Sequence, residues 1–385
     1  MIMISDKKNC SGCKACQNAC SKDAISFKED NEGCWYPVVD MDKCIQCASC
    51  EKACPYNRDD HGIPMDNKTF SSNFFAVRLK ELALLDSVSS GGAFQALARG
   101  VLSNAGIVYG AAQENVDQIY HVRVTDEDEL KKTRRSKYFQ SDVRDCYSLA
   151  KKDLIEGKMV LFSGTGCQIA GLNCYLGKEY ENLYTCEVVC HGVPSRKIWE
   201  CYRREKEARE GKKIVDLVFR DKSIGWSKNQ YKITYEDGSV ECERSIYQLF
   251  HAGYLQGLFY RPSCGSCPFA KLPRVADISL ADYWKYKGKW NKNDLGVSLV
   301  AVNNSQGLEL FEKAKEFLNY EEITKEAALE SCRHMDHHPS ENPFRSDFLT
   351  TVFSEGYYKA AEKYIVIQKD KGIISRIKSF LRRLK

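Results

Sequence analysis

Short apolar runs, separated by polar or glycine-containing breaks, recur between residues 74 and 302. They occupy residues 74–79, 107–112, 120–124, 158–162, 182–189, 277–284 and 297–302. Runs of this length, rich in β-branched and aromatic residues, are typical of strands. A further pair, 214–219 and 231–235, predicts a β ribbon with a turn at 236–238. The pattern predicts a large sheet at the centre of a mixed domain.

Helical stretches follow two of these strands directly. Run 158–162 breaks at Ser163-Gly164-Thr165-Gly166, and a helix is expected from Cys167. Run 182–189 ends at Cys190, and another helix is expected from Ser195. Strand, glycine turn and helix make the βα unit of an α/β fold, whose ligands bind at the carboxyl ends of the strands. A helix N-terminus also lowers the pKa of a thiol, so we expect Cys167 to be a thiolate ligand or nucleophile.

The first 60 residues have a different organisation, dominated by cysteines at regular spacing. Two series of the form C-x2-C-x2-C-x3-C occur 34 residues apart: Cys10, Cys13, Cys16 and Cys20, then Cys44, Cys47, Cys50 and Cys54. This is the spacing of bacterial ferredoxins, in which the fourth cysteine of each series ligates the other cluster. We therefore expect Cys10, Cys13, Cys16 and Cys54 to hold one 4Fe-4S cluster, and Cys44, Cys47, Cys50 and Cys20 the second. A zinc knuckle or a redox C-x2-C pair would explain one series but not two in register.

Composition agrees with a reduced, soluble protein and excludes other classes. With 43% hydrophobic and 28% charged residues, the 385-residue chain is expected to be globular. The clustered cysteines indicate metal-bound thiolates and a cytoplasmic location, and we expect no signal peptide or membrane span. Residues 369–385 carry seven Lys/Arg and one Asp, a charge of +6, so the rest of the chain is near −1. Such a balance gives no support for nucleic-acid binding.

Four later cysteines suggest a third metal site. Cys167 and Cys190 each follow a strand, and Cys264-x2-Cys267 has metal-ligand spacing. Together they could hold a third 4Fe-4S cluster. A four-thiolate zinc site, two redox-active thiols and ordinary buried cysteines are the alternatives. Burial is expected for the remaining cysteines, including Cys34, and no metal is assigned to His334, His337 and His338.

Two polar stretches could bind an anionic cofactor. Ser87-Val88-Ser89-Ser90-Gly91-Gly92 precedes a helix-forming run, which suggests a phosphate cradle or, equally, a simple N-cap and turn. Residues 134–141 combine Arg134, Arg135 and Lys137 with two aromatic residues. This second stretch could stack a ring against an anionic cofactor, or be a solvated loop with core aromatics.

Several motifs in this order resemble the coenzyme F420 hydrogenase/dehydrogenase beta-subunit family, fused behind a dicluster ferredoxin module. The motifs are residues 89–94, 162–171, 189–195, 261–269 and 276–284, and the resemblance covers about 70–340. One departure is Gly166, where a proline often precedes the cysteine. The resemblance implies an iron–sulfur flavoprotein with FAD contacted by Ser89, Ser90, Gly91, Gly92, Lys137, Tyr138 and Ser141. It also implies that Cys167, Cys190, Cys264 and Cys267 ligate an adjacent cluster.

On this basis we expect an α+β or α/β protein whose domains are a 4Fe-4S ferredoxin at 1–60, a linker at 61–73, an FAD and iron–sulfur domain at 74–345 and C-terminal helices at 346–385. The expected function is an oxidoreductase that moves electrons between a ferredoxin or other redox partner, the clusters, FAD and a small organic substrate such as a deazaflavin. His191 and Asp282 are candidate proton donors, although His191 could only orient its loop and Asp282 could only cap a strand.

The main alternative is an electron-relay subunit without its own substrate, and a redox sensor is a third interpretation. An oligomer is compatible with each of them. The apolar positions of residues 373–384 fall on one helical face with basic residues elsewhere. Such a tail is suited to peripheral membrane contact, to docking on a partner or to packing on the body.

Overall fold

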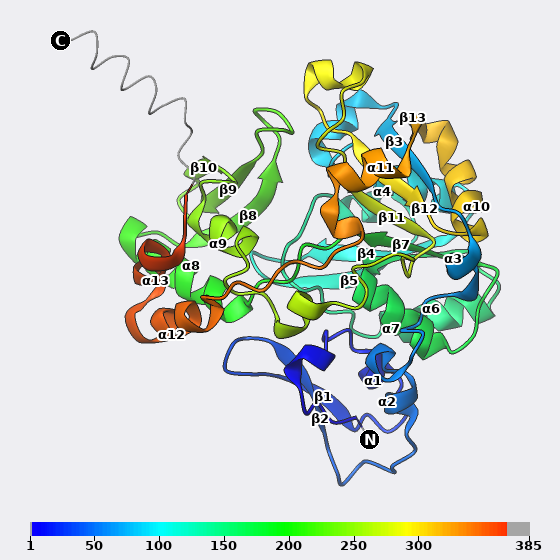
Figure 1. Ribbon diagram of the computed structural model, residues 1–385, viewed down its shortest axis with the longest axis horizontal. Helices are drawn as coiled ribbons and strands as arrows, with labels where there is room; N and C mark the ends of the chain where they lie inside the picture. The colour runs from blue at the N-terminus through cyan, green and yellow to red at the C-terminus, as the bar shows by residue number, and fades with distance from the viewer. Residues whose placement is uncertain (1, 368–385) are drawn as a thin grey trace.

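A small cysteine-rich module lies against one end of a larger α/β body (Figure 1). The computed structural model describes residues 2–367. No helix within that range is long and apolar enough to cross a membrane. The predicted tail helix at 373–384 lies outside the described residues. The mixed α/β class, with a large sheet and an N-terminal ferredoxin-like region, is confirmed.

The N-terminal module consists of one hairpin and short helices around its cysteines. Its elements are η1 (Lys7–Asn9), α1 (Ala15–Asn18), β1 (Ile25–Glu29), β2 (Trp35–Val39), α2 (Ser49–Lys52) and η2 (Pro55–Asn57). Strands β1 and β2 pair antiparallel, with Ile25 opposite Val39. Helices α1 and α2 each begin after a residue in the left-handed conformation, Lys14 and Ala48. In both cysteine series the chain therefore turns sharply just before the short helix that carries the third cysteine.

The body is built on a mixed sheet with the order β13-β3-β12-β11-β7-β6-β4-β5. Its strands are β3 (Asn73–Leu79), β4 (Ile107–Gln113), β5 (Ile119–Val124), β6 (Val160–Thr165), β7 (Leu183–Val188), β11 (Ile278–Asp282), β12 (Ser298–Val302) and β13 (Leu318–Ile323). Strands β4, β6, β7 and β11 are mutually parallel. Their carboxyl ends therefore meet at one edge, where α/β sheets bind ligands.

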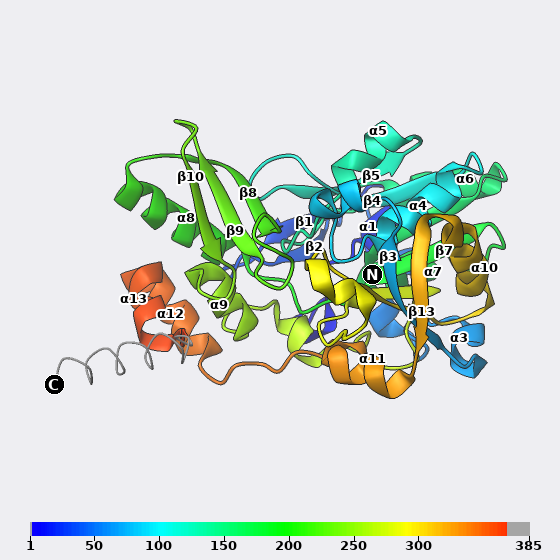
Figure 2. The ribbon, with the colours of Figure 1, turned by 90° about the horizontal axis from the view of Figure 1, so that it is seen from above.

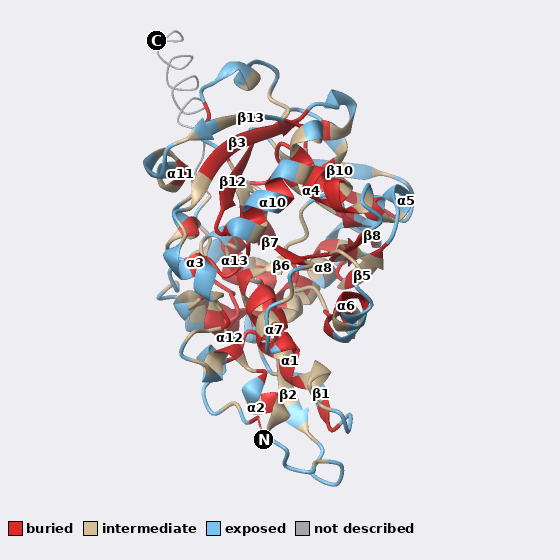
Figure 3. Ribbon diagram, turned by 90° about the vertical axis from the view of Figure 1, so that its right-hand side faces the viewer, coloured by how far each residue is buried: buried red, intermediate tan, exposed pale blue. Residues whose placement is uncertain are grey.

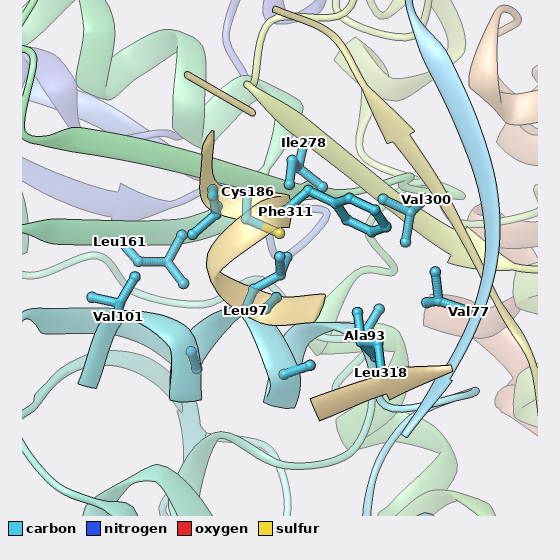
Figure 4. Close-up of a cluster of buried hydrophobic side chains, with 14 of the residues drawn as sticks. Val77, Ala93, Leu97, Val101, Leu161, Cys186, Ile278, Val300, Phe311 and Leu318 are labelled. Carbon is cyan, nitrogen blue, oxygen red and sulfur yellow. The ribbon is translucent and has the colours of Figure 1, made fainter. Parts of the chain in front are cut away.

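Two sets of helices cover this sheet. Helices α4 (Ala93–Leu102) and α10 (Ser305–Ala314) pack on each other and on one face, where Leu97, Phe311 and Val300 share a buried core (Figure 4). Helices α6 (Cys146–Ile155) and α7 (Gly166–Leu176) cover the other face. The N-terminal module adds to this second core, because α1 packs against α7 (Figure 3).

A smaller antiparallel sheet stands beside the large one (Figure 2). It contains β8 (Ile214–Asp221), β9 (Gln230–Tyr235) and β10 (Val240–Arg244), which confirms the predicted ribbon and adds a strand. Its aromatic core is shared with α8 (Arg196–Glu210), α9 (Leu249–Leu255), α12 (Arg345–Glu355) and α13 (Tyr357–Tyr364). The remaining helices are α3 (Met65–Thr69), η3 (Leu82–Ser87), α5 (Glu127–Leu130), η4 (Lys131–Thr133), η5 (Pro262–Ser266), η6 (Lys289–Asn293), η7 (Lys315–Phe317), α11 (Lys325–Ser331) and η8 (Arg333–Met335).

The stretch expected to be a linker is packed on the body. Helix α3 lies within it, and Asn67 is buried. The Asn67 amide donates to the carbonyl oxygens of Arg274 and Ala276, at 2.9 and 3.1 Å. Buried amides that are fully bonded fix a segment in place. The segment therefore joins the N-terminal module to the sheet as ordered structure.

Candidate functional site

The outermost cysteines of the N-terminal module surround one pocket. Cys20, Cys44, Cys47 and Cys50 all line it, together with apolar residues such as Ile25 and Val39. Backbone amides approach two of the sulfurs: Ile2 N–H donates to Cys50 Sγ and Ala24 N–H to Cys20 Sγ, each at 3.3 Å. Cys47 is exposed, and a hydrogen bond with Ser49 lowers the pKa of its thiol. We call these four residues the outer group.

The other four cysteines of the module lie deeper, and we call them the inner group: Cys10, Cys13, Cys16 and Cys54. Burial raises the pKa of Cys16 most, and the nearby thiols of Cys10 and Cys54 raise it further. Burial likewise raises the pKa of Cys13, with contributions from Cys16, Cys167 and Cys54. Cys54 thus stands with the first series and Cys20 with the second, which is the cross-over that the spacing predicts.

A third group forms at the carboxyl edge of the large sheet. Cys167 opens α7 after β6, Cys190 follows β7, and Cys264 and Cys267 lie in and just after η5. Burial raises the pKa of Cys264 most strongly, followed by the charges of Cys190 and Cys267. Four thiols from three separate loops therefore come together. Of the remaining cysteines, Cys34, Cys146, Cys174 and Cys186 are buried as expected, Cys201 and Cys332 are half-buried, and Cys242 is exposed.

The helix N-terminus was expected to lower the pKa of the Cys167 thiol, but the pKa is raised. Thr165 caps α7 and its hydroxyl lies 3.1 Å from Cys167 Sγ, which favours the thiolate. Burial nevertheless outweighs this hydrogen bond and raises the pKa. A buried thiolate here needs a cation beside it, which coordinated metal would supply.

The inner and third groups lie against each other. A Cβ on Gly171, one turn after Cys167, would stand 3.0 Å from Cys13 Sγ. Tyr56 lies between the two groups, because Cys267, Cys167, Cys264 and Cys13 all raise the pKa of its phenol after burial. The Tyr56 hydroxyl is buried and has no hydrogen-bond partner among residues 2–367. An acceptor such as a cluster sulfur would satisfy it.

A buried ion pair between Glu187 and Arg274 lies next to the third group. Glu187 on β7 is fully buried and accepts from Arg274 Nε and Nη2 at 2.7 and 2.8 Å. Ser279 donates to the same carboxylate at 2.7 Å. A Cβ on Gly166 would stand 2.6 Å from Glu187 Oε2. Glycine before Cys167 is therefore a steric requirement.

The two stretches predicted to contact a flavin lie side by side. The Ser89 and Ser136 hydroxyls are 3.0 Å apart, and Arg134 donates to Gln95 of α4 at 3.3 Å. No side chain caps the N-terminus of α4. Ser90 and Gly91 have packing roles: Ser90 donates to the Val297 carbonyl at 2.7 Å, and Gly91 N–H donates to Ser298 Oγ at 2.9 Å. Gly92 supplies the left-handed residue before the helix.

Three further residues predicted to contact the flavin, Lys137, Tyr138 and Ser141, each have different neighbours. Lys137 donates to the Arg134 carbonyl at 2.6 Å, and burial lowers its pKa to about 7. The Tyr138 ring packs edge-on against Phe219, His251 and Tyr254. Ser141 Oγ lies 2.8 Å from His121 Nδ1. Ser141 thus belongs to a hydrogen-bonded network under the sheet edge.

Asp282 is part of a cluster that the sequence alone did not reveal. Arg220 donates to its two oxygens at 2.5 and 3.2 Å, and Trp226 Nε1 donates to Oδ1 at 3.0 Å. These partners outweigh burial and hold the carboxyl pKa below its usual value. Trp226 and Trp284 stack with ring centroids 4.4 Å apart. An ionised carboxylate is a poor proton donor, so this geometry suits Asp282 to orienting Arg220.

His191 forms a pair with a histidine far away in the sequence. Its Nδ1 lies 2.6 Å from Nε2 of His334, and burial lowers the pKa of His191 to about 4. Its ring also meets Tyr254 and Tyr260 edge-on. The predicted cluster of His334, His337 and His338 thus contributes one member to the surroundings of Cys190.

Arg220, Arg261, Trp226 and His334 were missed because their contacts join distant segments. The only sequence signal was local: Arg261 and Trp284 lie inside motifs already noted for their cysteines or aspartates. No spacing rule connects Arg220 to Asp282, which are 62 residues apart.

Fold and site together define an iron–sulfur redox protein in which a ferredoxin module is joined to a mixed α/β domain. Residues 9–58 match the 4Fe-4S dicluster domain. Residues 157–326 match the family described as the C terminus of the beta subunit of coenzyme F420 hydrogenase/dehydrogenase. These two matches confirm the resemblance seen in the motifs.

Three relatives, all ferredoxins or ferredoxin-type proteins, match short stretches of the chain. A ferredoxin from Alicyclobacillus acidocaldarius is 40% identical over 76 residues, which is 18% of this chain and 91% of the ferredoxin. An uncharacterized ferredoxin from Methanocaldococcus jannaschii is 33% identical over 55 residues, 14% of this chain and 70% of its own length. The ferredoxin-type protein NapF of Haemophilus influenzae is 40% identical over 45 residues, 12% of this chain but only 26% of its own length.

A solved structure is similar over most of the chain. It is a chain of the F420-reducing [NiFe] hydrogenase complex from Methanosarcina barkeri, in a xenon-derivatised crystal. The TM-score is 0.45 with 17% identity, over 71% of this chain and 96% of that one.

Proposed function

We propose that this protein is an iron–sulfur flavoprotein oxidoreductase that moves electrons between a ferredoxin-type donor and a small organic substrate. The observation that carries the proposal is the meeting of Cys167, Cys190, Cys264 and Cys267 beside the inner cysteine group. The bound clusters would supply one-electron transfer, and FAD would couple it to two-electron chemistry. The family description adds coenzyme F420, a deazaflavin, as the substrate class to test first.

Each group of four cysteines is proposed to hold one 4Fe-4S cluster. The outer group is Cys20, Cys44, Cys47 and Cys50, the inner group Cys10, Cys13, Cys16 and Cys54, and the third group Cys167, Cys190, Cys264 and Cys267. No set of three or more Cys, His, Asp or Glu side chains within residues 2–367 is arranged to hold a single metal ion. Zinc would need four sulfurs about 2.3 Å from one centre, whereas cubane ligands bind separate irons.

The side chains around α4 fit the anionic part of a dinucleotide. The uncapped helix N-terminus offers free amides, and Arg134 stands beside it. Lys222 is buried nearby and donates to the Ser90 carbonyl at 2.7 Å. Arg220 lies two residues earlier, near the end of β8. Positive side chains and a helix N-terminus are the groups that bind phosphate. Ser89, Lys137 and Tyr138 are the residues we assign to flavin contact, with Ser141 positioning the loop through His121.

His191 and Asp282 receive different roles. His191 is proposed to move a proton near the third group and to exchange it with His334, whose Nε2 lies 2.6 Å from His191 Nδ1. Asp282 is proposed to orient Arg220, whose guanidinium lies 5.0 Å from the Trp284 ring centroid. Trp284 is 47% exposed, so a planar substrate could reach this cation and ring.

Electrons are proposed to enter at the outer group. Cys47 is exposed there, and the neighbouring Ile45 and Met41 are exposed apolar side chains at 59% and 51%. Exposed apolar residues around a redox centre suit a transient protein partner.

Anaerobic purification, with iron and flavin analysis, tests the proposal. At four irons per cubane we expect about twelve irons per chain, and one releasable FAD. Reduced ferredoxin with oxidised coenzyme F420 then tests turnover. About eight irons would remove the third cluster, and absence of flavin would remove the catalytic role. Full cofactor content without reduction of any organic acceptor would favour the electron-relay subunit instead.

A further inference from the structure

Arg261 is a buried cation at the boundary between the N-terminal module and the body. Only 2% of the residue is exposed. Its Nε donates to the Cys10 carbonyl at 2.8 Å, and Nη2 donates to the Trp35 carbonyl at 2.7 Å. Nη1 donates to Gln140 Oε1 at 3.2 Å. Nη2 also lies 3.7 Å from Cys10 Sγ, within range of an N–H···S hydrogen bond.

The guanidinium also lies over the Tyr36 ring, with Cζ 4.5 Å from the ring centroid, but no carboxylate pairs with its charge. Among the ion pairs of residues 2–367, none includes Arg261. An uncompensated buried charge costs several kcal/mol, roughly, unless an anion lies close by. The thiol that this guanidinium contacts is that of Cys10, whose Sγ lies 3.7 Å from Nη2. The Arg261 guanidinium therefore indicates that its compensating negative charge lies on the group that Cys10 helps to bind.

The position of Arg261 is specific to two of the three cysteine groups. It contacts Cys10 of the inner group directly. It also begins the loop of the third group, where Cys264 N–H donates to the Arg261 carbonyl at 2.9 Å. The outer group surrounds a separate pocket formed by residues 20–25, 39 and 44–50.

We propose that Arg261 raises the reduction potential of the inner cluster relative to the outer one, and so makes the inner position the preferred resting place for an electron; this inference rests on the proposed cluster assignment. Reduction adds one electron, and hence one negative charge, to a cluster and its four thiolates. A fixed cation stabilises the reduced form more than the oxidised form because the attraction grows with that charge. Hydrogen bonds to the sulfurs act in the same direction.

The Arg261 side chain therefore both joins the N-terminal module to the body and directs electron transfer. Because Arg261 holds the Cys10 and Trp35 carbonyls, its guanidinium keeps a fixed place relative to the inner group. The third group is linked to the same residue, since Cys264 N–H donates to the Arg261 carbonyl at 2.9 Å. An electron entering at the outer group is therefore drawn toward the body.

The test is an EPR-monitored redox titration of the full-length, iron-loaded protein. In Arg261→Gln we expect the inner-cluster midpoint to become more negative, while the outer-cluster midpoint stays at the wild-type value. Arg261→Lys keeps the charge and is expected to recover most of the shift. Arg345→Met is the matched control, because Arg345 pins the same interface through Glu32 and the Tyr260 carbonyl without touching Cys10.

Four outcomes decide the matter. An unchanged inner midpoint in Arg261→Gln, with about twelve irons still present, overturns the inference. An equal shift in Arg345→Met also overturns it, because loosening of the interface would then be the cause. Should Arg261→Gln lose its clusters, the wild-type titration decides: an inner midpoint at or below the outer midpoint overturns the inference. Wild-type protein with fewer than about eight irons would instead contradict the proposed function itself.

Discussion

The Sγ atom of Cys13 lies 3.0 Å from the position that a Cβ atom on Gly171 would occupy. Cys13 belongs to the N-terminal module and Gly171 to α7, the helix that begins with the third group. The missing side chain therefore lets the two modules come into van der Waals contact where their cysteine groups are nearest. The Tyr147 hydroxyl, 3.1 Å from the same position, closes the remaining space.

Gly171→Ala is expected to destabilise the protein by about 1–3 kcal/mol, because overpacking a tight contact outweighs the better helix propensity of alanine. The measurement is the guanidinium unfolding midpoint of the iron-loaded protein. We also expect faster loss of iron from the inner group, followed by its absorbance. A midpoint equal to that of the wild type would show that the interface yields easily at this point.

Cys190→Ala is expected to lower the iron content by about four per chain, because the third group would lose one ligand. Cys186→Ala is the matched control, since both cysteines come from the β7 segment and Cys186 is buried in the core shown in Figure 4. That control should retain the wild-type iron content. Equal iron loss in both variants would point to general destabilisation of β7, and no loss in either would remove Cys190 from the ligand set.

Glu187→Gln is expected to cost about 3–5 kcal/mol of stability, because it leaves the buried Arg274 charge without a carboxylate. Chemical unfolding monitored by circular dichroism measures the loss. Ser279→Ala removes a neutral donor to the same carboxylate and an acceptor for the Asn303 amide, and it should cost about 1–2 kcal/mol. Similar values for the two variants would mean that the ion pair contributes no more than an ordinary hydrogen bond.

The sequence predicted the parts of this protein that depend on local spacing. Spacing within a few residues determines the geometry of the two cysteine series and of the C-x2-C pair at Cys264. It also determines the strands that precede Cys167 and Cys190. The strands found at 107–113 and 183–188 agree with the apolar runs within one or two residues. The family motifs added the order in which these elements occur.

Contacts between distant segments could not be predicted in this way. Arg261 reaches Cys10 across 251 positions, and nothing around either residue indicates the pairing. The pKa of Cys167 was mispredicted for a related reason: the helix N-terminus is visible in the sequence, whereas the depth of burial depends on the whole fold. The role of Gly166 likewise depends on Glu187, which lies 21 positions later on the neighbouring strand.

His121 and His251 are expected to make the protein less stable as the pH falls from about 6.5 toward 4. Burial lowers the pKa of His121 to about 4 and that of His251 to about 3. The His121 ring is held as the neutral form between Ser141 Oγ at 2.8 Å and the Ser163 carbonyl at 2.9 Å. An unfolded histidine titrates near 6.5, so between these values the unfolded chain binds a proton that the folded chain does not.

Each of these histidines should therefore cost about 1.4 kcal/mol per pH unit below 6.5, or about 2 kcal/mol at pH 5. His121→Gln should remove one such contribution and flatten the slope of unfolding midpoint against pH between 7 and 5. Gln118→Ala is the control, because this exposed side chain does not titrate and should leave the slope unchanged. A slope in His121→Gln equal to that of the wild type would mean that the imidazole takes up its proton without unfolding, and that the Ser141 loop can rearrange to accept it.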